Sequence, residues 1–192
     1  MAMHSELWFP NVIWSAIIHC VDNNALKTWA YNRKRNDIGR SVSNYAGYQS
    51  SDIIKKQSPE IDILVDYVDR EIDNCRKQVG LPPCELQNIW LNINPPGAYN
   101  KLHNHQGAVF SGVYFVDASS YQGNLEFERS DGAEYYLPEV PDKLTYYTAT
   151  KTTYVAKTNG LYIFPSWLKH SVQGNQAKTD RISISFNYSI IS

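Results

Sequence analysis

Residues 181–190 read Arg-Ile-Ser-Ile-Ser-Phe-Asn-Tyr-Ser-Ile, and this stretch decides the fold class. Large apolar side chains take every second position, at Ile182, Ile184, Phe186 and Tyr188. Small polar side chains take the positions between them, at Ser183, Ser185, Asn187 and Ser189. Because successive side chains of a strand point to opposite faces of its sheet, the stretch predicts a β-strand with one apolar and one polar face.

Shorter runs with the same period come earlier in the chain. They are rich in apolar and β-branched residues and are separated by Gly, Pro and Asn turns, at residues 89–93, 109–116, 125–128, 152–156 and 160–164. Many short strands between such turns are typical of a sandwich or a barrel-like jelly roll. We therefore predict a mainly β core over residues 85–192.

The first part of the chain shows helical periodicity instead. Apolar residues recur at helical spacing at Ile61, Leu64, Val65, Val68, Ile72, Cys75 and Val79. Before them, Ser58-Pro59-Glu60 predicts a helix start with Ser58 as the cap, and Gly80 ends the pattern. A shorter helix is predicted over residues 24–33. Residues 1–84 are thus expected to form a helical buttress within a single domain of residues 1–192.

Charge and cysteine content exclude several classes of protein. The 192 residues include 18 basic and 19 acidic side chains, so the net charge of −1 argues against binding nucleic acid by electrostatics. The three cysteines have neither disulfide nor zinc-site spacing, which indicates a reducing compartment. No signal peptide is recognisable, and no apolar run approaches the roughly 20 residues of a membrane span. The sequence thus predicts a cytoplasmic protein without a membrane anchor.

Three of the five histidines form a pattern that suits a metal ion. His103 and His105 are two positions apart, so on a strand they point the same way. His170 follows Pro165-Ser166-Trp167 after a predicted strand and supplies a third imidazole. Imidazoles suit Fe, Zn, Cu or Ni, and three protein ligands leave positions open for other molecules. The remaining two histidines, His4 and His19, are interpreted as ordinary polar residues.

Two families of metal-binding jelly rolls compete for this pattern. Gly97 followed by His103 and His105 fits the start of the first cupin motif, and the stretch from Gly160 to Asn175 loosely fits the second. The cupin motif next requires a glutamate ligand, and this sequence has Val109-Phe110 at that point. The cupin interpretation therefore lacks its carboxylate.

Arg181 lies eleven residues after His170, and Ser183 follows two positions later. The other family is the Fe(II)/2-oxoglutarate-dependent oxygenases, which have an arginine about ten residues after the distal histidine of the metal site, and this sequence resembles them at that point. A planar guanidinium binds a carboxylate through two parallel hydrogen bonds, and a hydroxyl two residues along a strand faces the same way. The competing interpretation of Arg181 is a salt bridge at the end of the barrel.

Several stretches together resemble a subgroup of Fe(II)/2-oxoglutarate-dependent oxygenases from bacteria and phages. The matching stretches are residues 43–50, 94–97, 102–105, 111–116, 123–127, 160–170 and 181–187. The resemblance implies a double-stranded β-helix (jelly roll), Fe(II) as the metal, and 2-oxoglutarate and dioxygen as cosubstrates. It also extends the expected location to a phage-infected bacterial cell.

The resemblance assigns residues to roles in such a site. It implies a metal site of His103, His105 and His170 and a cosubstrate carboxylate on Arg181 and Ser183. Tyr114, on the strand after the histidine pair, is a candidate for a hydrogen bond to the cosubstrate if its side chain points inward. Asn92 and Asn187 are polar residues inside otherwise apolar strands and are candidates to face the same cavity. For each of the three, a cross-strand hydrogen bond without a catalytic role is the competing interpretation. No catalytic residue beyond this site is predicted.

One position departs from the family pattern. The carboxylate of the usual His-x-Asp motif is replaced by His105. Three interpretations stay open: a three-histidine site, a site in which only one of the pair is a ligand, or a counterpart of the His-x-Gly of aspartyl/asparaginyl β-hydroxylases at His105-Gln106-Gly107.

The expected activity is hydroxylation of a protein side chain, an amino acid or another small metabolite. Two alternatives are a cupin-type enzyme that does not use 2-oxoglutarate and a non-catalytic jelly-roll module for phage or host interaction. Aromatic residues make up 13% of the chain, and we expect substrate contact from tyrosines in the connection over residues 130–151. The candidate tyrosines around the mouth are Tyr45, Tyr48, Tyr121, Tyr135, Tyr136, Tyr146, Tyr147 and Tyr154. The long N-terminal helix could also form the surface of a homodimer.

Overall fold

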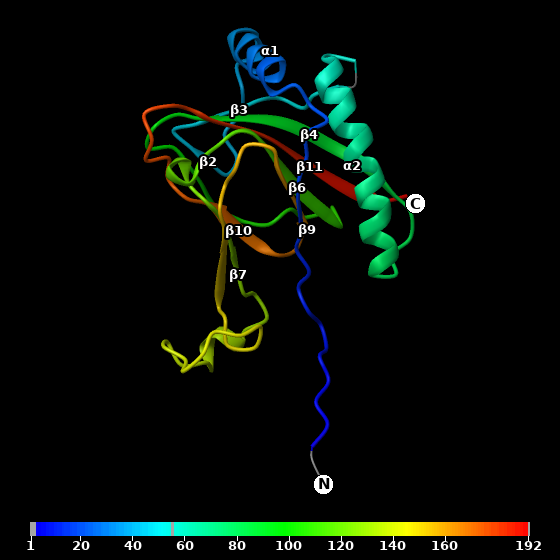
Figure 1. Cartoon of the computed structure of the whole chain (residues 1–192), viewed down its shortest axis with the longest axis vertical. Helices are drawn as coiled ribbons and strands as arrows, with labels where there is room; N and C mark the ends of the chain where they lie inside the picture. Colours follow the sequence, from blue (N-terminus) through cyan, green and yellow to red (C-terminus); the bar gives the residue numbers. More distant parts are fainter. Residues whose placement is uncertain (1–2, 55, 192) are drawn as a thin grey trace.

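The computed structural model of the chain describes residues 3–54 and 56–191 and contains two antiparallel sheets and two helices (Figure 1). The larger sheet has, in spatial order, β1 (Trp14–Ile17), β9 (Gly160–Pro165), β6 (Phe110–Asp117), β11 (Arg181–Ile190), β4 (Cys84–Asn94) and β3 (Tyr48–Gln49). The smaller sheet has β2 (Asn44–Tyr45), β5 (Tyr99–His103), β10 (Lys169–Val172), β7 (Leu125–Glu128) and β8 (Lys151–Tyr154). Short 3₁₀ turns lie at Ser120–Gln122 and Ala133–Tyr135. The predicted double-stranded β-helix, mainly β with N-terminal helices, is confirmed.

The strand β11 carries the alternation that its sequence predicts, but both of its faces are buried. Its apolar side chains belong to a core shared with the two helices. Its polar side chains lie on the face that is turned toward the smaller sheet. On this face, neighbouring strands of the larger sheet pair Ser183 with Asn92, and Asn187 with both Asn88 and Ser111. The polar face of the central strands is therefore the inner wall of the barrel, where polar groups are available for chemistry.

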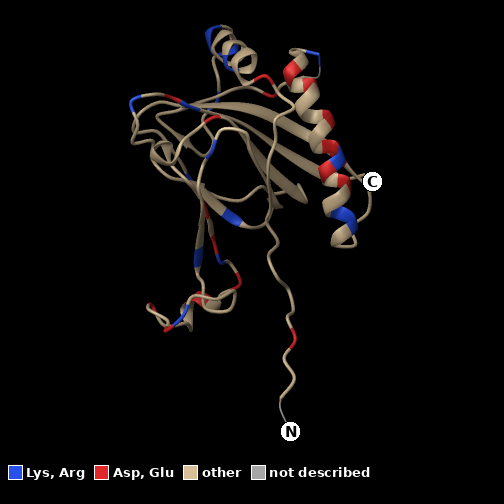
Figure 2. Ribbon diagram, in the orientation of Figure 1, with Lys and Arg blue, Asp and Glu red and all other residues tan. Residues whose placement is uncertain are grey.

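Both predicted helices are present and cover one face of the larger sheet (Figure 1). Helix α1 spans Asn23–Asn36 and is capped by Asp22, whose carboxylate accepts hydrogen bonds from two backbone N–H groups. Helix α2 spans Pro59–Gln78, with acidic residues in its first turn and basic residues in its last (Figure 2). This charge order stabilises the helix because it opposes the macrodipole. Among the described residues, no helix has both the length and the apolar character that crossing a membrane requires.

The predicted cap of α2 is wrong in its detail. Ser58 precedes the helix as expected, but its hydroxyl makes no hydrogen bond to a backbone N–H of the first turn. It donates instead to the Glu60 carboxylate at 2.6 Å. The acidic side chain lies within reach of the hydroxyl and accepts its hydrogen, so the capping interaction is replaced by a contact between side chains.

The first 84 residues are not purely helical, which corrects the predicted buttress. This segment also supplies β1, which pairs with β9 at one edge of the larger sheet, and β2 and β3, which pair with β5 and β4. These strands have only four, two and two residues. So short a strand shows no period of its own, since its conformation is set by the strand that it joins.

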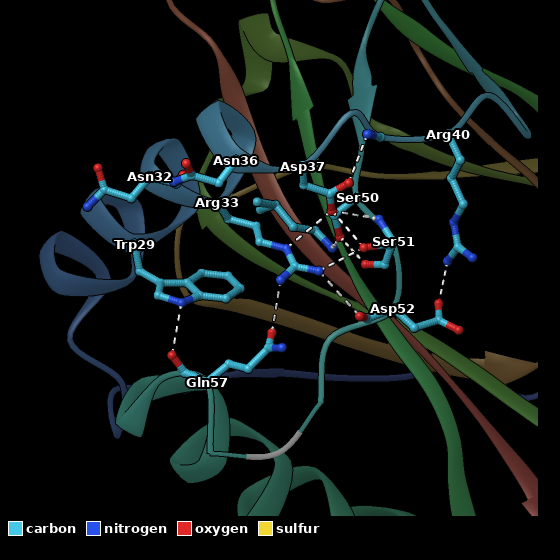
Figure 3. A network of polar contacts seen from close by, with 12 residues as sticks. Trp29, Asn32, Arg33, Asn36, Asp37, Arg40, Ser50, Ser51, Asp52 and Gln57 are labelled. Carbon is cyan, nitrogen blue, oxygen red and sulfur yellow. Dashed lines mark hydrogen bonds and ion pairs between the residues drawn. The ribbon is translucent and has the colours of Figure 1, made fainter.

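The loop that carries β2 and β3 is fixed to α1 by a polar network (Figure 3). The Asp37 carboxylate accepts from the backbone N–H and the hydroxyl of Ser51, at 2.9 and 2.8 Å, and pairs with Arg33 at 3.2 Å. Burial alone would raise the pKa of Asp37, but the hydrogen bonds from Gly39 and Ser51 and the charge of Arg33 lower it to about 2. The network holds the loop against the sheet and so brings Ser43 to the edge of the barrel cavity.

Candidate metal centre

Three histidines meet at one end of the barrel. His103 ends β5 and lies directly opposite His170 on the neighbouring strand β10. His105 lies two residues beyond the end of β5, where its backbone N–H donates to the Ser166 carbonyl at 2.9 Å. The expected placement of both histidines on one strand is therefore wrong, but the loop still turns His105 toward the other two. The ring centroids are 4.3 to 5.0 Å apart.

The hydrogen bonds of two imidazoles fix which nitrogen can bind a metal. Nδ1 of His103 lies 2.7 Å from the Lys101 carbonyl oxygen, and Nδ1 of His170 lies 2.9 Å from that of Leu168. A carbonyl oxygen only accepts, so each Nδ1 carries the hydrogen and each Nε2 keeps a free lone pair. Both rings are thus held in the tautomer that presents Nε2 as a ligand.

The third imidazole makes a comparable contact to a side chain. Nδ1 of His105 lies 2.5 Å from the side-chain oxygen of Asn187 and 2.9 Å from the Ser111 hydroxyl. One nitrogen from each of the three rings lies within 4.8 Å of the others. Burial lowers the pKa of all three imidazoles, that of His170 to about 3, which keeps them neutral at neutral pH. Three neutral nitrogen donors are a set that Fe(II) accepts.

Arg181 lies in the wall of the same cavity and is 1% exposed. Its guanidinium donates to the carbonyl oxygens of Gln122 and Gln173, and its other terminal nitrogen lies 3.5 Å from the Asn100 side-chain oxygen. None of the ion pairs found among residues 3–54 and 56–191 includes Arg181. Burial lowers its pKa to about 10, so the group stays charged at neutral pH. A buried cation without a counter-charge indicates a site for an anion.

Two other predicted residues line the cavity together with Arg181. Ser183 and Asn92 face each other across β11 and β4, and both belong to the cavity wall. The Asn92 amide donates to the Ser185 hydroxyl at 3.0 Å, while its side-chain oxygen is buried and has no protein partner among the described residues. An orphaned acceptor at this depth suits a donor group on a bound molecule.

Tyr114 does not belong to the site, which corrects its predicted role. It pairs across the strands with Ile184, so its side chain lies on the apolar face of the sheet, toward the helices. Its hydroxyl donates to the Asn23 side-chain oxygen at 2.8 Å. It also lies 3.1 Å from the Asn159 side-chain oxygen. The side chains that face the cavity from this strand are those of its neighbours Val113 and Phe115.

The residues of the cavity wall that the sequence reasoning missed include Trp90 and Asn100. Trp90 lines the cavity, and its ring centroid lies 5.6 Å from that of His105. It is two positions before Asn92, so the period of the strand places it on the same face. Asn100 lies on β5, three residues before His103, and carries no motif that marks it. The pairing of β10 with β5 shifts register between His170 and Val172, so the position of Asn100 relative to β10 cannot be predicted from a sequence pattern.

The predicted tyrosines fall into different surroundings. Tyr154 packs against Phe127 and Tyr162 in the smaller core, and Tyr48 packs against the larger one. Tyr45 stacks on Tyr99, with ring centroids 4.8 Å apart. The others are largely exposed, namely Tyr121, Tyr135, Tyr136, Tyr146 and Tyr147. Core packing therefore accounts for Tyr48 and Tyr154, and most of the others are surface residues.

A family model described as "Putative 2OG-Fe(II) oxygenase" matches residues 88–187, which is more than half of the chain. The chain belongs to the 2OG-Fe(II) oxygenases. The cofactors of this family are Fe(II) and 2-oxoglutarate, and the three imidazoles and the buried guanidinium are groups that fit them. The match sets aside the cupin-type alternative. No curated protein sequence matches the chain.

Solved structures of other 2OG oxygenases have a similar fold. A prolyl-4-hydroxylase from Pseudomonas putida has a TM-score of 0.65 at 15% identity, over 94% of this chain and 93% of that one. The 2-oxoglutarate-dependent epimerase SnoN from nogalamycin biosynthesis has a TM-score of 0.69 at 12% identity, over 94% of this chain and 78% of SnoN. A viral collagen prolyl hydroxylase from Paramecium Bursaria Chlorella virus-1 has a TM-score of 0.62 at 12% identity, over 93% of this chain and 96% of the viral enzyme. At these identities the likeness shows the fold alone.

Proposed function

We propose that this 2OG-Fe(II) oxygenase is a hydroxylase that uses a three-histidine metal site. The observation that carries the proposal is the buried Arg181 guanidinium, which has no counter-charge among the described residues and shares a cavity with the three imidazoles. When bound, Fe(II) supplies the redox chemistry by which a substrate C–H group, dioxygen and 2-oxoglutarate become C–OH, succinate and carbon dioxide.

The side chains of the barrel bind and orient the reactants. Arg181 and Ser183 hold the carboxylate of 2-oxoglutarate that is remote from the metal, and the orphaned Asn92 oxygen accepts from a donor group in the cavity. The three imidazoles would hold the metal and, as only three ligands, would leave coordination positions open for the reactants. Phe115 and Leu125 supply apolar wall on the facing sheets and exclude water from the space between.

The first test is turnover of 2-oxoglutarate. Purified protein given Fe(II), ascorbate and 2-oxoglutarate is expected to release succinate slowly without substrate, and the release should stop when Fe(II) is replaced by Zn(II). Succinate is measured by mass spectrometry, and Fe(II) affinity by titration. Metal binding without any succinate, with or without candidate substrates, would favour the non-catalytic binding module over the hydroxylase.

We further propose that the substrate is a protein side chain that meets the arm between β7 and β8, residues 129–150. The base of the arm lies beside the metal centre, because Phe127 is directly opposite His170 in the sheet. The arm projects beyond the two sheets (Figure 1). Its tyrosines are 67–91% exposed, at Tyr135, Tyr136, Tyr146 and Tyr147. Two of the similar folds are prolyl hydroxylases by name, which supports a polypeptide substrate.

Replacing Tyr135 and Tyr136 with serine is expected to reduce substrate-stimulated succinate formation at least about tenfold, because exposed aromatic side chains supply much of the affinity of peptide contacts. The acceptors are a library of proline-containing and other peptides, with free amino acids in parallel. The control is Tyr121→Ser, which removes a tyrosine of similar exposure outside the arm. Equal stimulation of succinate formation in the double variant and the wild type would reject substrate binding by the arm. Stimulation by free amino acids alone would reject a polypeptide substrate.

A further inference from the structure

We infer that Asn187 is a positioning residue that makes His105 a metal ligand by fixing its tautomer. The inference rests on the proposed three-histidine site and explains how that site manages without the carboxylate of the His-x-Asp motif. His103 and His170 each donate Nδ1–H to a backbone carbonyl two residues earlier in the chain. In the part of the chain that the structure describes, no backbone carbonyl takes this place for His105, and its Nδ1 faces the Asn187 side-chain oxygen instead.

The orientation of the Asn187 amide is set from its other side. Its Nδ2 donates to the Asn88 side-chain oxygen at 2.9 Å, which leaves Oδ1 toward His105. The two residues are directly opposite each other on β11 and β4. If the amide were reversed, it would offer N–H groups to His105 Nδ1 and favour the tautomer in which Nε2 carries the hydrogen. That tautomer cannot bind a metal through Nε2.

Ser111 closes the network on the neighbouring strand β6. Its hydroxyl lies 2.7 Å from Asn187 Oδ1, and an amide oxygen only accepts, so Ser111 donates to Asn187. The Ser166 hydroxyl, at 2.8 Å, then donates to Ser111. Because its one hydroxyl hydrogen is donated to Asn187, Ser111 cannot also donate to His105 Nδ1. The arrangement that satisfies every group therefore has the hydrogen on Nδ1 of His105.

The network is buried and uncharged. Ser111 and Ser166 are fully buried, and Asn187 is buried between two paired strands. A neutral amide fixes the imidazole without adding a buried negative charge, which would cost free energy in the absence of a metal. The same side chains also explain why small polar residues occupy the inner face of these strands beside His105.

Asn187→Leu and Asn187→Asp form a matched pair that tests the inference. Leucine cannot accept a hydrogen bond, whereas aspartate can. In long-range ¹H–¹⁵N spectra of the metal-free wild type, all three site histidines are expected to carry the hydrogen on Nδ1. In Asn187→Leu, His105 alone should lose this signature, while His103 and His170 serve as internal controls. Fe(II) affinity should fall about 10- to 100-fold in Asn187→Leu and recover to within a few-fold of wild type in Asn187→Asp.

Two results would overturn the inference. One is a wild-type spectrum in which His105 carries its hydrogen on Nε2, which needs no variant and so does not depend on the folding of one. The other is an unchanged His105 tautomer and Fe(II) affinity in folded Asn187→Leu. If the tautomer and affinity follow the expectation but no succinate forms, the proposed hydroxylase fails and the positioning role stands.

Discussion

Replacing Arg181 with glutamine is expected to weaken 2-oxoglutarate binding by about 100-fold, or about 3 kcal/mol. The guanidinium is the one charged group in the cavity wall and has no counter-charge among the described residues, so a bound carboxylate is its natural partner. Glutamine removes both the charge and the two-pronged donor geometry. The measurement is calorimetric titration of the Mn(II)-loaded protein with 2-oxoglutarate.

Ser183→Ala is the matched control for this measurement. Ser183 lies on the same inner face of β11, two residues from Arg181, but it contributes a neutral hydroxyl. Its loss should weaken binding by less than about tenfold. Fe(II) affinity should stay unchanged in both variants, since neither side chain contacts the imidazoles. Equal affinity for 2-oxoglutarate in Arg181→Gln and wild type would show that Arg181 is only a structural group.

The position of the guanidinium is fixed by close packing around Gly123. This residue has φ +92°, a region that side chains rarely adopt, and a Cβ there would lie 2.0 Å from the Gln173 carbonyl oxygen and 2.6 Å from Arg181 Nη1. The carbonyl oxygens of Gln122 and Gln173, which accept from Arg181, thus belong to two chain segments that approach each other too closely for a side chain at position 123. Such packing places the charge accurately for a small dicarboxylate.

The sequence predicted those parts of the fold and site that depend on local periodicity. Residues 181–190 and the two helices were readable because their patterns extend over several turns or strand positions. Arg181 and Ser183 were predicted from their spacing after His170 and from the family resemblance, and Asn92 as a polar residue inside an apolar strand; the structure places all three in one cavity. The three histidines could be grouped because their side chains suit only a few chemical roles.

The rest depended on which strands pair and in what register. Tyr114 was assigned to the wrong face because its strand is apolar on both faces, and only its pairing with Ile184 shows which way it points. The strands β2 and β3 are two residues long and follow the strands that they join. Asn100 and Ser43 reach the cavity only through such pairings, which a single sequence does not encode locally.

Replacing His170 with alanine is expected to lower Fe(II) affinity on the order of 1,000-fold, because it removes one of three nitrogen ligands from the centre of the site. His105→Ala should cause a loss of similar size if the site has three histidines. The measurement is Fe(II) or Co(II) titration, with circular dichroism to confirm folding, and His4→Ala is the control because His4 lies in the exposed N-terminal segment.

The ratio of the two losses distinguishes the ligand sets. The hydrogen bond from His105 to Asn187 leaves Nε2 of His105 as free as that of His170, so the structure favours comparable losses. A loss below about tenfold in His105→Ala, beside a large loss in His170→Ala, would mean that His105 is not a ligand. Since Asn187 contacts His105 and not His170, that result would also confine the role of Asn187 to packing. The departure from His-x-Asp would then concern substrate contact and not the metal.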